Sequence, residues 1–353
     1  MIPKRQATWP AAARRGGGRQ RPGAVHGAVA VAVPARLHLG LLDLEGRSGR
    51  RFGSFGITLE GPRTRLVAAR ARGLSAEGPD AARVEAYLAA TVHHFGLGDA
   101  LDGGCHIRVE EAIPAHSGLG SGTQLALATG AAACALAGVE AAPRVLAQAL
   151  DRGRRSGVGI GAFERGGVLL DGGKGRDSRP PPVICRMAFP ADWRIILLLD
   201  SGHHGLHGAD ELAAFAALPP FPDEQAAQLC RVVLLGALPA LAEADIVAFG
   251  AAVSELQRVT GDHFAPAQGG RFASPRVAAA LAWLEQAGVP GLGQSSWGPT
   301  GFALVESEGA ARRLLDGLGA SSAAEGLEVR LCQGRNSGAT VEPVVAEVIA
   351  AGP

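Results

Sequence analysis

The sequence predicts an α+β protein of two domains. A length of 353 residues is typical of about two domains. Hydrophobic residues make up 47% of the chain, which is enough to form a core in each domain. Apolar runs with the alternating period of a strand recur between longer runs with helical spacing. We place the domain boundary near Ala188, so that the first domain covers residues 26–188 and the second covers residues 189–353.

Charge and composition limit the kinds of molecule that this protein is expected to bind. The 34 basic and 33 acidic residues leave a formal net charge of +1, which provides no general attraction to nucleic acid or to a membrane. No apolar run reaches the length of a membrane span, and the scattered cysteines lack the spacing of a zinc site. We therefore expect a cytoplasmic protein that acts on small molecules. Residues 1–25 are basic and predict a disordered tail; the alternative, an arm that binds nucleic acid, has no support elsewhere in the chain.

A glycine-rich stretch, Glu110–Gln124, lies between a predicted strand and a predicted helix. The alternating run Cys105–Glu110 precedes the glycines, and the Ala- and Leu-rich run Leu125–Val139 follows them. Glycines let the backbone turn sharply and expose its N–H groups, and a hydroxyl can cap the helix whose positive dipole end faces the loop. Such a loop favours a phosphate or pyrophosphate. Its residues are Gly118, Leu119, Gly120, Ser121, Gly122, Thr123 and Gln124.

The alternative for this stretch is a plain strand-to-helix turn that happens to be rich in glycine. Neither the dinucleotide fingerprint nor the P-loop fits, because no Lys-Ser or Lys-Thr pair follows the glycines. Three alternating glycines and two hydroxyls at a helix start favour phosphate binding.

The chain before this loop is predicted to form strands. An apolar, Val-rich run leads into a segment whose alternation places Arg36 and His38 on one face and leucines on the other. That polar face either contacts an anionic substrate or is simply solvated, and both interpretations stay open. A glycine-spaced turn at residues 50–56 then precedes a strand Ile57–Glu60, with Thr64–Ala69 as its predicted partner.

Two helices and a second glycine-spaced segment complete the first domain. The runs Asp80–Phe95 and Ala142–Asp151 have helical spacing. Three arginines, of which Arg155 is the last, then precede alternating glycines that include Gly157 and Gly159. Two glycine loops, one of them beside an arginine cluster, suggest that a polyanion is held from two sides.

The second domain begins with the continuous apolar strand Trp193–Asp200, of the kind that is buried on both faces. The three histidines within residues 203–207 predict a flexible loop rather than a metal site, because the glycines among them argue against a shared helix face. Helices and strands then alternate. The predicted helices are Leu229–Gly236, Ala240–Val259, Pro275–Ala287 and Ala310–Leu318, and the predicted strands are Phe302–Glu306 and Leu327–Cys332.

A third glycine-rich loop, Gly291–Gly301, contains small hydroxyl residues and one tryptophan. A tryptophan ring is costly to expose, so it packs either in the core or against a ligand, and both interpretations stay open. The candidate residues of this loop are Gln294, Ser295, Ser296, Trp297 and Thr300.

These three segments resemble the motifs of the GHMP kinase superfamily. Pro34–Asp43 approximates the first motif, Pro114–Gln124 the second with its Gly-Leu-Gly-Ser core, and Gly291–Gly301 the third. The resemblance implies a ribosomal S5 domain 2-like first domain and a ferredoxin-like second domain, with the substrate between them. The chain departs from the kinases after the loop serine, and its Ser156–Gly159 segment lacks the aspartate base of many members.

With those departures the chain is similar to one branch of the superfamily, the β-ribofuranosylaminobenzene 5′-phosphate synthases. The matching segments are Arg36–Leu41, Gly118–Gln124, Arg155–Glu164 and Gly293–Thr300. The resemblance implies condensation of phosphoribosyl pyrophosphate with 4-aminobenzoate, with release of CO₂ and pyrophosphate, in methanopterin biosynthesis. The alternatives are an ATP-dependent small-molecule kinase and a catalytically silent binding protein on the same scaffold.

The resemblance also implies roles for the residues. Amides and hydroxyls of the central loop, together with Mg²⁺, would hold the leaving pyrophosphate. Arg36 and Arg155 would bind phosphate or carboxylate groups, His38 would hydrogen-bond the substrate, and Trp297 would stack on the aminobenzoate ring. The ring carbon that bears the carboxylate would attack the sugar, and loss of CO₂ would restore aromaticity without a base.

The candidate Mg²⁺ ligands are Ser121 and the carboxylates Asp43, Glu111 and Glu164. For each carboxylate the alternative is a surface or structural role. We expect a homodimer that binds neither nucleic acid nor membrane.

Overall fold

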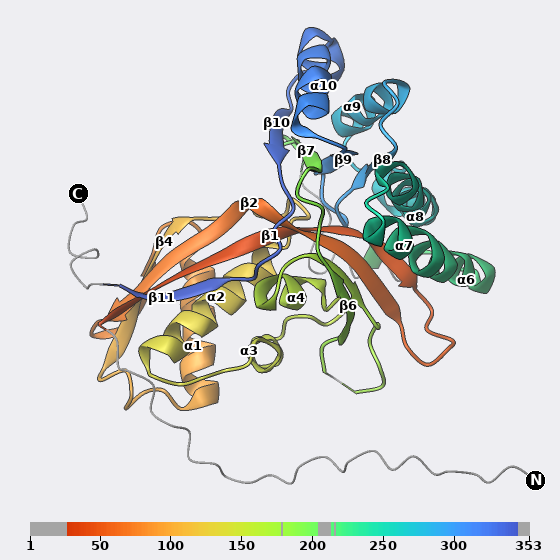
Figure 1. The fold of residues 1–353 in the computed structure, drawn as a ribbon. Helices are drawn as coiled ribbons and strands as arrows, with labels where there is room; N and C mark the ends of the chain where they lie inside the picture. The colour runs from red at the N-terminus through yellow and green to blue at the C-terminus, as the bar shows by residue number, and fades with distance from the viewer. Residues whose placement is uncertain (1–26, 178, 204–212, 215–216, 345–353) are drawn as a thin grey trace, which may run out of the picture.

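The computed structural model describes residues 27–177, 179–203, 213–214 and 217–344. Within these residues the chain forms a larger sheet of seven strands and a smaller sheet of four, each with helices packed against it (Figure 1). The two sheets correspond to the two halves of the predicted α+β fold, which the structure confirms.

The larger sheet is built on two long strands that form an antiparallel pair. Strand order is β11-β1-β2-β4-β3, and β5 and β6 extend from the other part of β2. The pair β3 and β4 is parallel, whereas the other pairs of this sheet are antiparallel. The strands are β1 (Ala28–Asp43), β2 (Phe52–Arg70), β3 (Gly73–Glu77), β4 (Gly104–Glu111), β5 (Val168–Asp171), β6 (Val183–Met187) and β11 (Thr340–Val344).

The helices between β3 and β5 lie on one side of the larger sheet (Figure 1). The central one is rich in alanine and almost wholly buried, because small side chains let it lie close to the sheet and to its neighbouring helices. Its buried residues and those of β1 and β4 form the core of this layer. The helices are α1 (Ala81–Phe95), α2 (Ser121–Leu136), α3 (Pro143–Ala149) and α4 (Val158–Glu164).

The smaller sheet has the order β10-β7-β9-β8, which is 4-1-3-2 in chain order and is the ferredoxin-like arrangement that the resemblance implied. Two helices, α9 and α10, pack on one face of this sheet. Its strands are β7 (Arg194–Leu199), β8 (Gly291–Gln294), β9 (Gly301–Val305) and β10 (Glu328–Cys332). The helices of this half are α6 (Asp223–Arg231), the π-helix η1 (Val232–Ala237), α7 (Leu238–Ala242), α8 (Ile246–Gln268), α9 (Pro275–Gln286), α10 (Glu308–Ala320) and the short 3₁₀ helix η2 (Ser322–Ala324).

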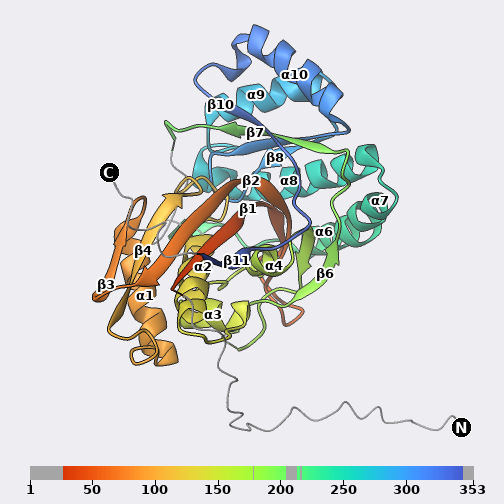
Figure 2. The same cartoon turned by 60° about the vertical axis from the view of Figure 1, so that its left-hand side comes forward.

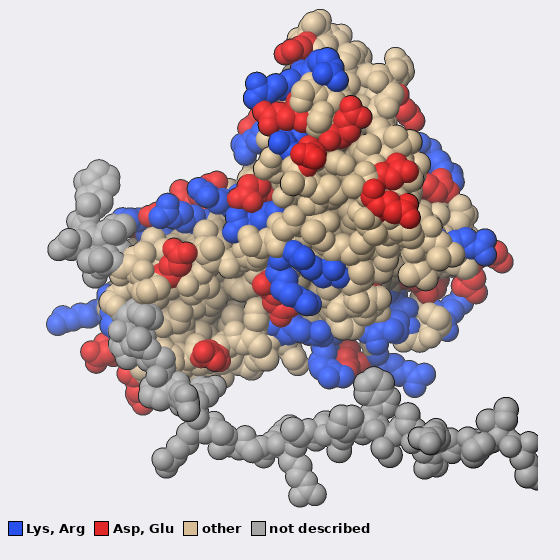
Figure 3. Space-filling view, viewed as in Figure 1, with Lys and Arg blue, Asp and Glu red and all other residues tan. Residues whose placement is uncertain are grey.

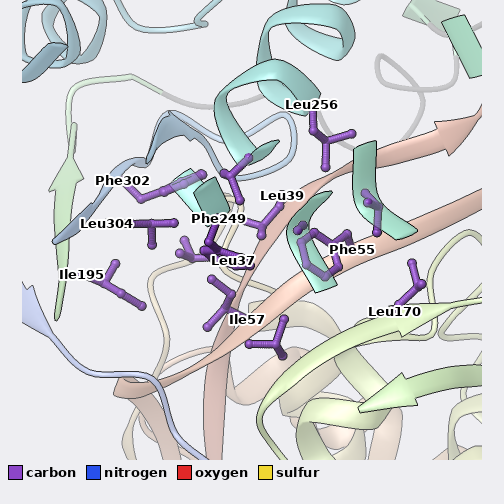
Figure 4. Close-up of a cluster of buried hydrophobic side chains, with 14 of the residues drawn as sticks. Leu37, Leu39, Phe55, Ile57, Leu170, Ile195, Phe249, Leu256, Phe302 and Leu304 are labelled. Atoms are coloured by element: carbon purple, nitrogen blue, oxygen red, sulfur yellow. The ribbon is translucent and has the colours of Figure 1, made fainter. Parts of the chain in front are cut away.

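A single hydrophobic cluster joins the two halves. Leu37 and Leu39 of β1 pack with Phe249 of α8 and with Ile195 and Phe302 of the smaller sheet, all of them buried (Figure 4). Each such side chain contributes about 1.5–3 kcal/mol when it is removed from water. The long helix α8 therefore fixes the position of one sheet relative to the other. Figure 2 shows α8 between the two sheets from a second side.

Several predicted elements agree with the structure within one or two residues, including β4, β7, α1 and α9. The pair His93 and His94 is exposed in the last turn of α1, as expected for a solvated helix end. Of the predicted histidine loop, only His203 is described, and residues 204–212 lie outside the described residues.

The prediction that Ile57–Glu60 pairs with Thr64–Ala69 is wrong. Both segments belong to the single strand β2, which pairs with β1 along its length. Register shifts in β1 at Pro34 and between His38 and Gly40 let the two long strands curve together, so no turn is needed between the segments. The turn predicted at residues 50–56 lies slightly earlier, because β2 already begins at Phe52.

Two further elements differ from the sequence prediction. The second glycine-spaced segment is not a loop, because α4 begins directly after Gly157 and includes the glycines that follow. The C-terminal strand β11 leaves the smaller sheet's half of the chain and pairs with β1 at the edge of the larger sheet.

The helical stretch Asp223–Ala242 is long and apolar enough, by length and composition alone, to cross a membrane. Arg231 and Pro239 interrupt this stretch, so the sequence pattern alone did not predict a membrane span here. A core helix of a soluble protein passes the same test, so this stretch is weak evidence for a membrane.

Acidic and basic side chains are interspersed over much of the face shown in Figure 3, and basic ones gather near α4 and β6. This distribution agrees with the nearly balanced formal charge.

Candidate active site

The three segments singled out in the sequence meet at one point between the two halves. The backbone N–H of Arg36 donates to the carbonyl of Leu119 at 3.1 Å, and its guanidinium Nη1 donates to the carbonyl of Gly118. The Ser295 hydroxyl donates to the same Gly118 carbonyl at 2.8 Å. Ser295 in turn accepts from the backbone N–H of His38 at 3.0 Å. The first, second and third motifs are therefore joined by direct hydrogen bonds.

Glycine is required where the second and third loops touch. Gly118 has φ +81°, and a Cβ there would lie 2.1 Å from the Ser295 carbonyl oxygen. A Cβ on Gly298 would lie 2.2 Å from the Gly118 nitrogen. The two loops thus pack backbone against backbone, which any side chain at these positions would prevent.

The central loop ends at Gly120, which has φ +84° and is the N-cap of α2. No side-chain hydrogen bond caps this end, so the prediction that a hydroxyl of this loop caps the helix is wrong. Ser121 is instead the first helical residue. An uncapped helix N-terminus leaves first-turn N–H groups for an anion, which its dipole also favours.

Arg36 lies beneath this loop as a largely buried cation. A Cβ on Gly120 would be only 3.3 Å from its guanidinium carbon. Burial lowers the pKa of Arg36 to about 10, so the group stays charged at neutral pH. Its buried Nε has no hydrogen-bond partner within the described part of the chain. A buried charged donor of this kind is stabilised by an anion placed beside it.

An open hollow of about 460 Å³ lies next to the N-terminus of α2. Its walls are rich in arginine, and the acidic lining residue Asp151 forms a salt bridge with Arg154. Arg152 is held in place by Tyr87, to whose hydroxyl it donates and over whose ring its guanidinium lies at 5.1 Å. The polar and basic lining residues include Arg36, His38, Thr123, Arg152, Arg154, Arg155 and Ser156.

A buried carboxylate anchors the segment that carries these arginines. Asp171, at the end of β5, is 1% exposed and accepts from the backbone N–H groups of Gly157 at 2.7 Å, Ser54 at 3.1 Å and Gly173 at 2.9 Å. The Ser156 hydroxyl lies 3.3 Å from the same carboxylate. Burial raises the pKa of Asp171, although these donors oppose that shift. The arginine segment is therefore tied to the sheet immediately after Arg155.

A second, smaller cavity of about 40 Å³ adjoins the hollow on the side of α8. The two spaces share a wall, and the Trp297 ring on that wall lies 4.5 Å from the ring of Phe264, centroid to centroid. Residues of α8, among them Gln257, Thr260 and Gln268, line the cavity together with residues from outside this helix, namely Gly40, Arg271 and Gln294. The shared wall consists of His38, Leu41, Ser296 and Trp297.

His38 is a neutral group at this wall. It is 7% exposed, and burial lowers its pKa to about 3, with the nearby charges of Arg36 and Arg155 adding to the shift. At neutral pH the imidazole is therefore uncharged and offers one donor and one acceptor.

Comparison with known proteins identifies the family. Residues 83–167 match the GHMP kinases N terminal domain and residues 237–323 match the GHMP kinases C terminal domain. The β-ribofuranosylphenol 5′-phosphate synthase of Methanothermobacter thermautotrophicus is 34% identical over 298 residues, which cover 78% of this chain and 88% of that protein. The enzyme of the same name from Archaeoglobus fulgidus is 31% identical over 88% of this chain and 98% of its own length.

The chain belongs to the β-ribofuranosylphenol 5′-phosphate synthase family of the GHMP kinase superfamily. This confirms the resemblance found in the sequence, and the chain is an enzyme of the β-ribofuranosylphenol or aminobenzene 5′-phosphate synthase type.

Solved structures of more distant proteins share the fold. Homoserine kinase from Cytophaga hutchinsonii has a TM-score of 0.64 at 18% identity, covering 92% of this chain and 100% of that one. Mevalonate diphosphate decarboxylase from Staphylococcus aureus has a TM-score of 0.63 at 14% identity, covering 89% and 98%.

In this member of the synthase family, some predicted site residues lie on the walls of the two spaces and others do not. Arg36, His38, Thr123, Arg155 and Gly159 line the hollow. Gln294 lines the small cavity, and Ser296 and Trp297 line both spaces, so the Trp297 ring is at once buried and part of the wall.

Other predicted site residues are buried next to the site and line neither of the two spaces. The Leu119 side chain is in the hydrophobic core. Gln124 is fully buried and donates to the Gly159 carbonyl at 2.7 Å, which ties α2 to α4. Thr300 is 1% exposed, and its carbonyl accepts from the Ser295 backbone N–H at 2.9 Å.

The carboxylates considered as metal ligands are engaged elsewhere or lie outside the hollow. Asp43 accepts from the backbone N–H groups of Glu45 and Gly46 in the turn between β1 and β2, and Glu111 pairs with Arg63 at 2.9 Å on the surface. Glu164 is the last residue of α4 and is not among the residues that line the hollow. No group of three or more His, Cys, Asp or Glu side chains that could hold a metal occurs among the described residues.

Sequence reasoning missed Asp171 and the α8 residues of the small cavity. Asp171 is the last residue of the buried strand β5 and precedes two glycines. This was a usable signal, because a strand end is a common place for a functional or anchoring carboxylate. Gln257, Thr260 and Gln268 carried no such signal, since polar residues on a long helix normally face solvent.

Proposed function

We propose that this protein condenses 5-phosphoribosyl 1-pyrophosphate with 4-aminobenzoate, releasing CO₂ and pyrophosphate and forming β-ribofuranosylaminobenzene 5′-phosphate. One observation carries the proposal: a basic hollow at the N-terminus of a helix shares a wall, built around Trp297, with a second cavity. The guanidinium groups suit the phosphates of the sugar, and the tryptophan face suits a planar ring. The family relationship supports the same reaction type.

The reaction is a substitution at the anomeric carbon of the sugar. As the bond from C1 to pyrophosphate breaks, negative charge builds on the leaving group, and Arg36, Arg155 and the N-terminus of α2 would stabilise it. The ring carbon that bears the carboxylate supplies the electron pair for the new C–C bond. The bond to the carboxylate then breaks, its electrons return to the ring, and CO₂ leaves.

No ring proton is removed in this sequence, so the enzyme needs no carboxylate base. The hollow supports this mechanism, because Asp151, the carboxylate among its described lining residues, is paired with Arg154. In a kinase of this fold, an aspartate base would instead activate an alcohol, and the Ser156–Gly159 segment does not supply one.

We propose Mg²⁺ as the cofactor, bound chiefly by the pyrophosphate of the substrate. The hydroxyl of Thr123 lines the hollow, and Ser121 opens the helix beside it. Mg²⁺ commonly binds through substrate phosphates together with few protein oxygens and several waters, which fits a hollow whose described lining residues offer little free carboxylate. When bound, the ion would neutralise charge on the leaving group. We place the reaction in the cytoplasm.

The decisive experiment measures labelled CO₂ released from carboxyl-labelled 4-aminobenzoate, with and without phosphoribosyl pyrophosphate and Mg²⁺. We expect release only when both are present, and its loss when EDTA is added. Labelled 4-hydroxybenzoate is tested in parallel, because the names of the relatives refer to a ribofuranosylphenol. Absence of CO₂ from both acids, with ADP formed from ATP and an alcohol, would overturn the proposal in favour of a kinase.

A further inference from the structure

We propose that Arg152, held in position by Tyr87, forms a second anion subsite of the hollow and binds the 5-phosphate of the sugar substrate. This inference rests on the proposed function, which places the leaving pyrophosphate at Arg36, Arg155 and the N-terminus of α2 but assigns no residue to the 5-phosphate.

The proposed substrate carries negative charge at two places. In phosphoribosyl pyrophosphate the diphosphate is attached to C1 of the ribose and a single phosphate is attached to C5, at opposite ends of the sugar. A phosphate that leaves water needs a charged or hydrogen-bonding partner of its own, and a guanidinium matches its geometry. The hollow must therefore present positive charge at two separate positions.

Two arginines of the hollow have buried donors without a partner. Within the described part of the chain, the buried arginine nitrogens that lack a hydrogen-bond partner are Nε of Arg36 and Nε of Arg152. Both residues line the hollow. A guanidinium has donors and no acceptor, so only a ligand with acceptor atoms can satisfy it. The neighbouring carboxylate of Asp151 does not serve Arg152, because both of its oxygens accept from Arg154.

Tyr87 holds the Arg152 side chain in place before a ligand arrives. Nη2 of Arg152 donates to the Tyr87 hydroxyl, and the guanidinium carbon lies 5.1 Å from the centre of the Tyr87 ring. Tyr87 itself is 9% exposed, so it is a firm support. Nη1 of Arg152 makes no hydrogen bond to the described residues and remains for a ligand. A side chain that is already ordered loses less conformational entropy when it binds.

Two arginines mark different sides of the start of α2. Arg36 lies against Gly120, where a Cβ would be 3.3 Å from its guanidinium carbon. Arg83 of α1 lies against Gly122, where a Cβ would be 2.9 Å from its Nη2. Positions two residues apart on an α-helix point about 200° apart around its axis. Arg36 and Arg83 therefore flank the first turn of α2 from nearly opposite sides.

The Tyr87 side chain belongs to the side of Arg83. Burial acts to lower the pKa of Arg83, but interactions with Tyr87 and with Asp80 outweigh burial and raise that pKa. Asp80 accepts from Arg83 at 3.2 Å, which leaves Arg152 as the arginine of this group without a carboxylate partner. The second subsite is therefore separated from Arg36 by the N-terminus of α2.

The test measures the dissociation constants of two fragments of the substrate, ribose 5-phosphate and pyrophosphate with Mg²⁺, by isothermal titration calorimetry. A salt concentration of 0.15 M gives a screening length of about 8 Å, which limits the effect of a lost charge on the more distant fragment. Arg152→Gln should weaken ribose 5-phosphate by about tenfold or more and pyrophosphate by less than about twofold. Arg36→Gln should show the reverse order.

Tyr87→Phe tests the positioning role. The variant keeps the ring but loses the hydroxyl that accepts from Arg152, so it should weaken ribose 5-phosphate about fivefold and leave pyrophosphate unchanged. A purely structural role would lower the urea midpoint and change neither constant. The control is Arg70→Gln, which should change neither constant. Arg70 donates to the carbonyls of Ala100 at 2.9 Å and Leu136 at 3.2 Å, near the opposite end of α2.

The outcomes separate this inference from the proposed function. If the wild type releases no labelled CO₂ from either aromatic acid, the proposed function is wrong. If the wild type releases CO₂ but does not bind ribose 5-phosphate at millimolar concentration, the second subsite is wrong while the function stands. The same conclusion follows if Arg152→Gln weakens both fragments equally, weakens pyrophosphate more, or weakens neither. Tyr87→Phe provides the comparison should Arg152→Gln fail to fold, which its urea midpoint shows.

Discussion

Replacing Asp171 by Asn tests whether a single buried carboxylate holds the arginine side of the site. One carboxylate oxygen accepts from Gly157 N and Ser156 Oγ, and the other from Ser54 N and Gly173 N. An amide has one acceptor oxygen. In either orientation of the amide, its NH₂ group replaces one carboxylate oxygen. At least one backbone N–H that donated to that oxygen is then left without an acceptor.

The cost follows from these contacts. A lost hydrogen bond to a charged group costs about 1.5–3 kcal/mol, and a buried donor left unpaired costs about 1–3 kcal/mol. Burial raises the pKa of Asp171, so the neutral amide recovers part of the cost of burying the charge. We therefore expect Asp171→Asn to lower the free energy of unfolding by about 3 kcal/mol, measured from the midpoint and slope of urea denaturation.

The same variant should raise the KM for phosphoribosyl pyrophosphate about tenfold and change the KM for the aromatic acid much less, because the segment it releases carries Arg154 and Arg155. Asp151→Asn is the matched control. Asp151 lies in the same segment, but its side chain is exposed and pairs with an exposed Arg154, so its loss should leave the urea midpoint nearly unchanged. Equal urea midpoints for the two variants would refute the anchoring role of Asp171.

Three further predictions concern the junction of the motifs. Gly118→Ala should reduce turnover at least a hundredfold, because its Cβ would lie 2.1 Å from the Ser295 carbonyl. The control is Gly98→Ala, whose Cβ would meet nothing within 4 Å. Similar rates for the two variants would contradict the packing of the two loops. Trp297→Ala should raise the KM for 4-aminobenzoate more than that for the sugar phosphate, and an unchanged KM would assign Trp297 to the core alone. Because the pKa of His38 falls to about 3 on folding, the unfolded chain binds a proton that the native chain does not between pH 6.5 and 3. The free energy of unfolding should therefore fall with decreasing pH in that range, by up to about 1.4 kcal/mol per pH unit from this group, and this group should not affect it above pH 6.5. His38→Gln should remove that part of the pH dependence, measured by urea titrations at pH 5 and 7.5. An unchanged pH dependence would count against the buried neutral imidazole.

The sequence predicted the parts of the fold that depend on local pattern. Strand β4, the loop and α2 follow from alternation, glycine and a long helical run, and these signals are contained within residues 104–136. The pairing of Ile57–Glu60 and Thr64–Ala69 was predicted wrongly because Gly61-Pro62 reads locally as a turn. Only β1, which runs beside both segments, decides that they form one strand.

The same limit explains the second glycine segment. Alternating glycines next to arginines indicated a loop, yet the structure has helix α4 there. The glycines are present because α4 packs so closely that its neighbours leave room only for small residues. A Cβ on Gly159 would lie 3.2 Å from Thr123, and one on Gly161 would lie 2.8 Å from Val183. The sequence contains the requirement for small residues but not the neighbours that impose it.

The candidate active site lies in a closely packed seam that leaves little room for hinge motion between the two halves. A Cβ on Gly293 would lie 2.3 Å from Gln257, and one on Gly40 would lie 2.8 Å from Leu256. Gln257 also donates to Leu39, and the Ser296 backbone N–H donates to the His38 carbonyl at 3.1 Å. Contacts this close hold the basic hollow and the aromatic wall at a fixed separation before substrate arrives. The proposed reaction requires such a separation, because it must align a ring carbon with an anomeric carbon. It follows that substitutions in the seam should lower kcat even where they touch neither substrate, since a displacement of about 1 Å between reacting groups costs on the order of a hundredfold in rate.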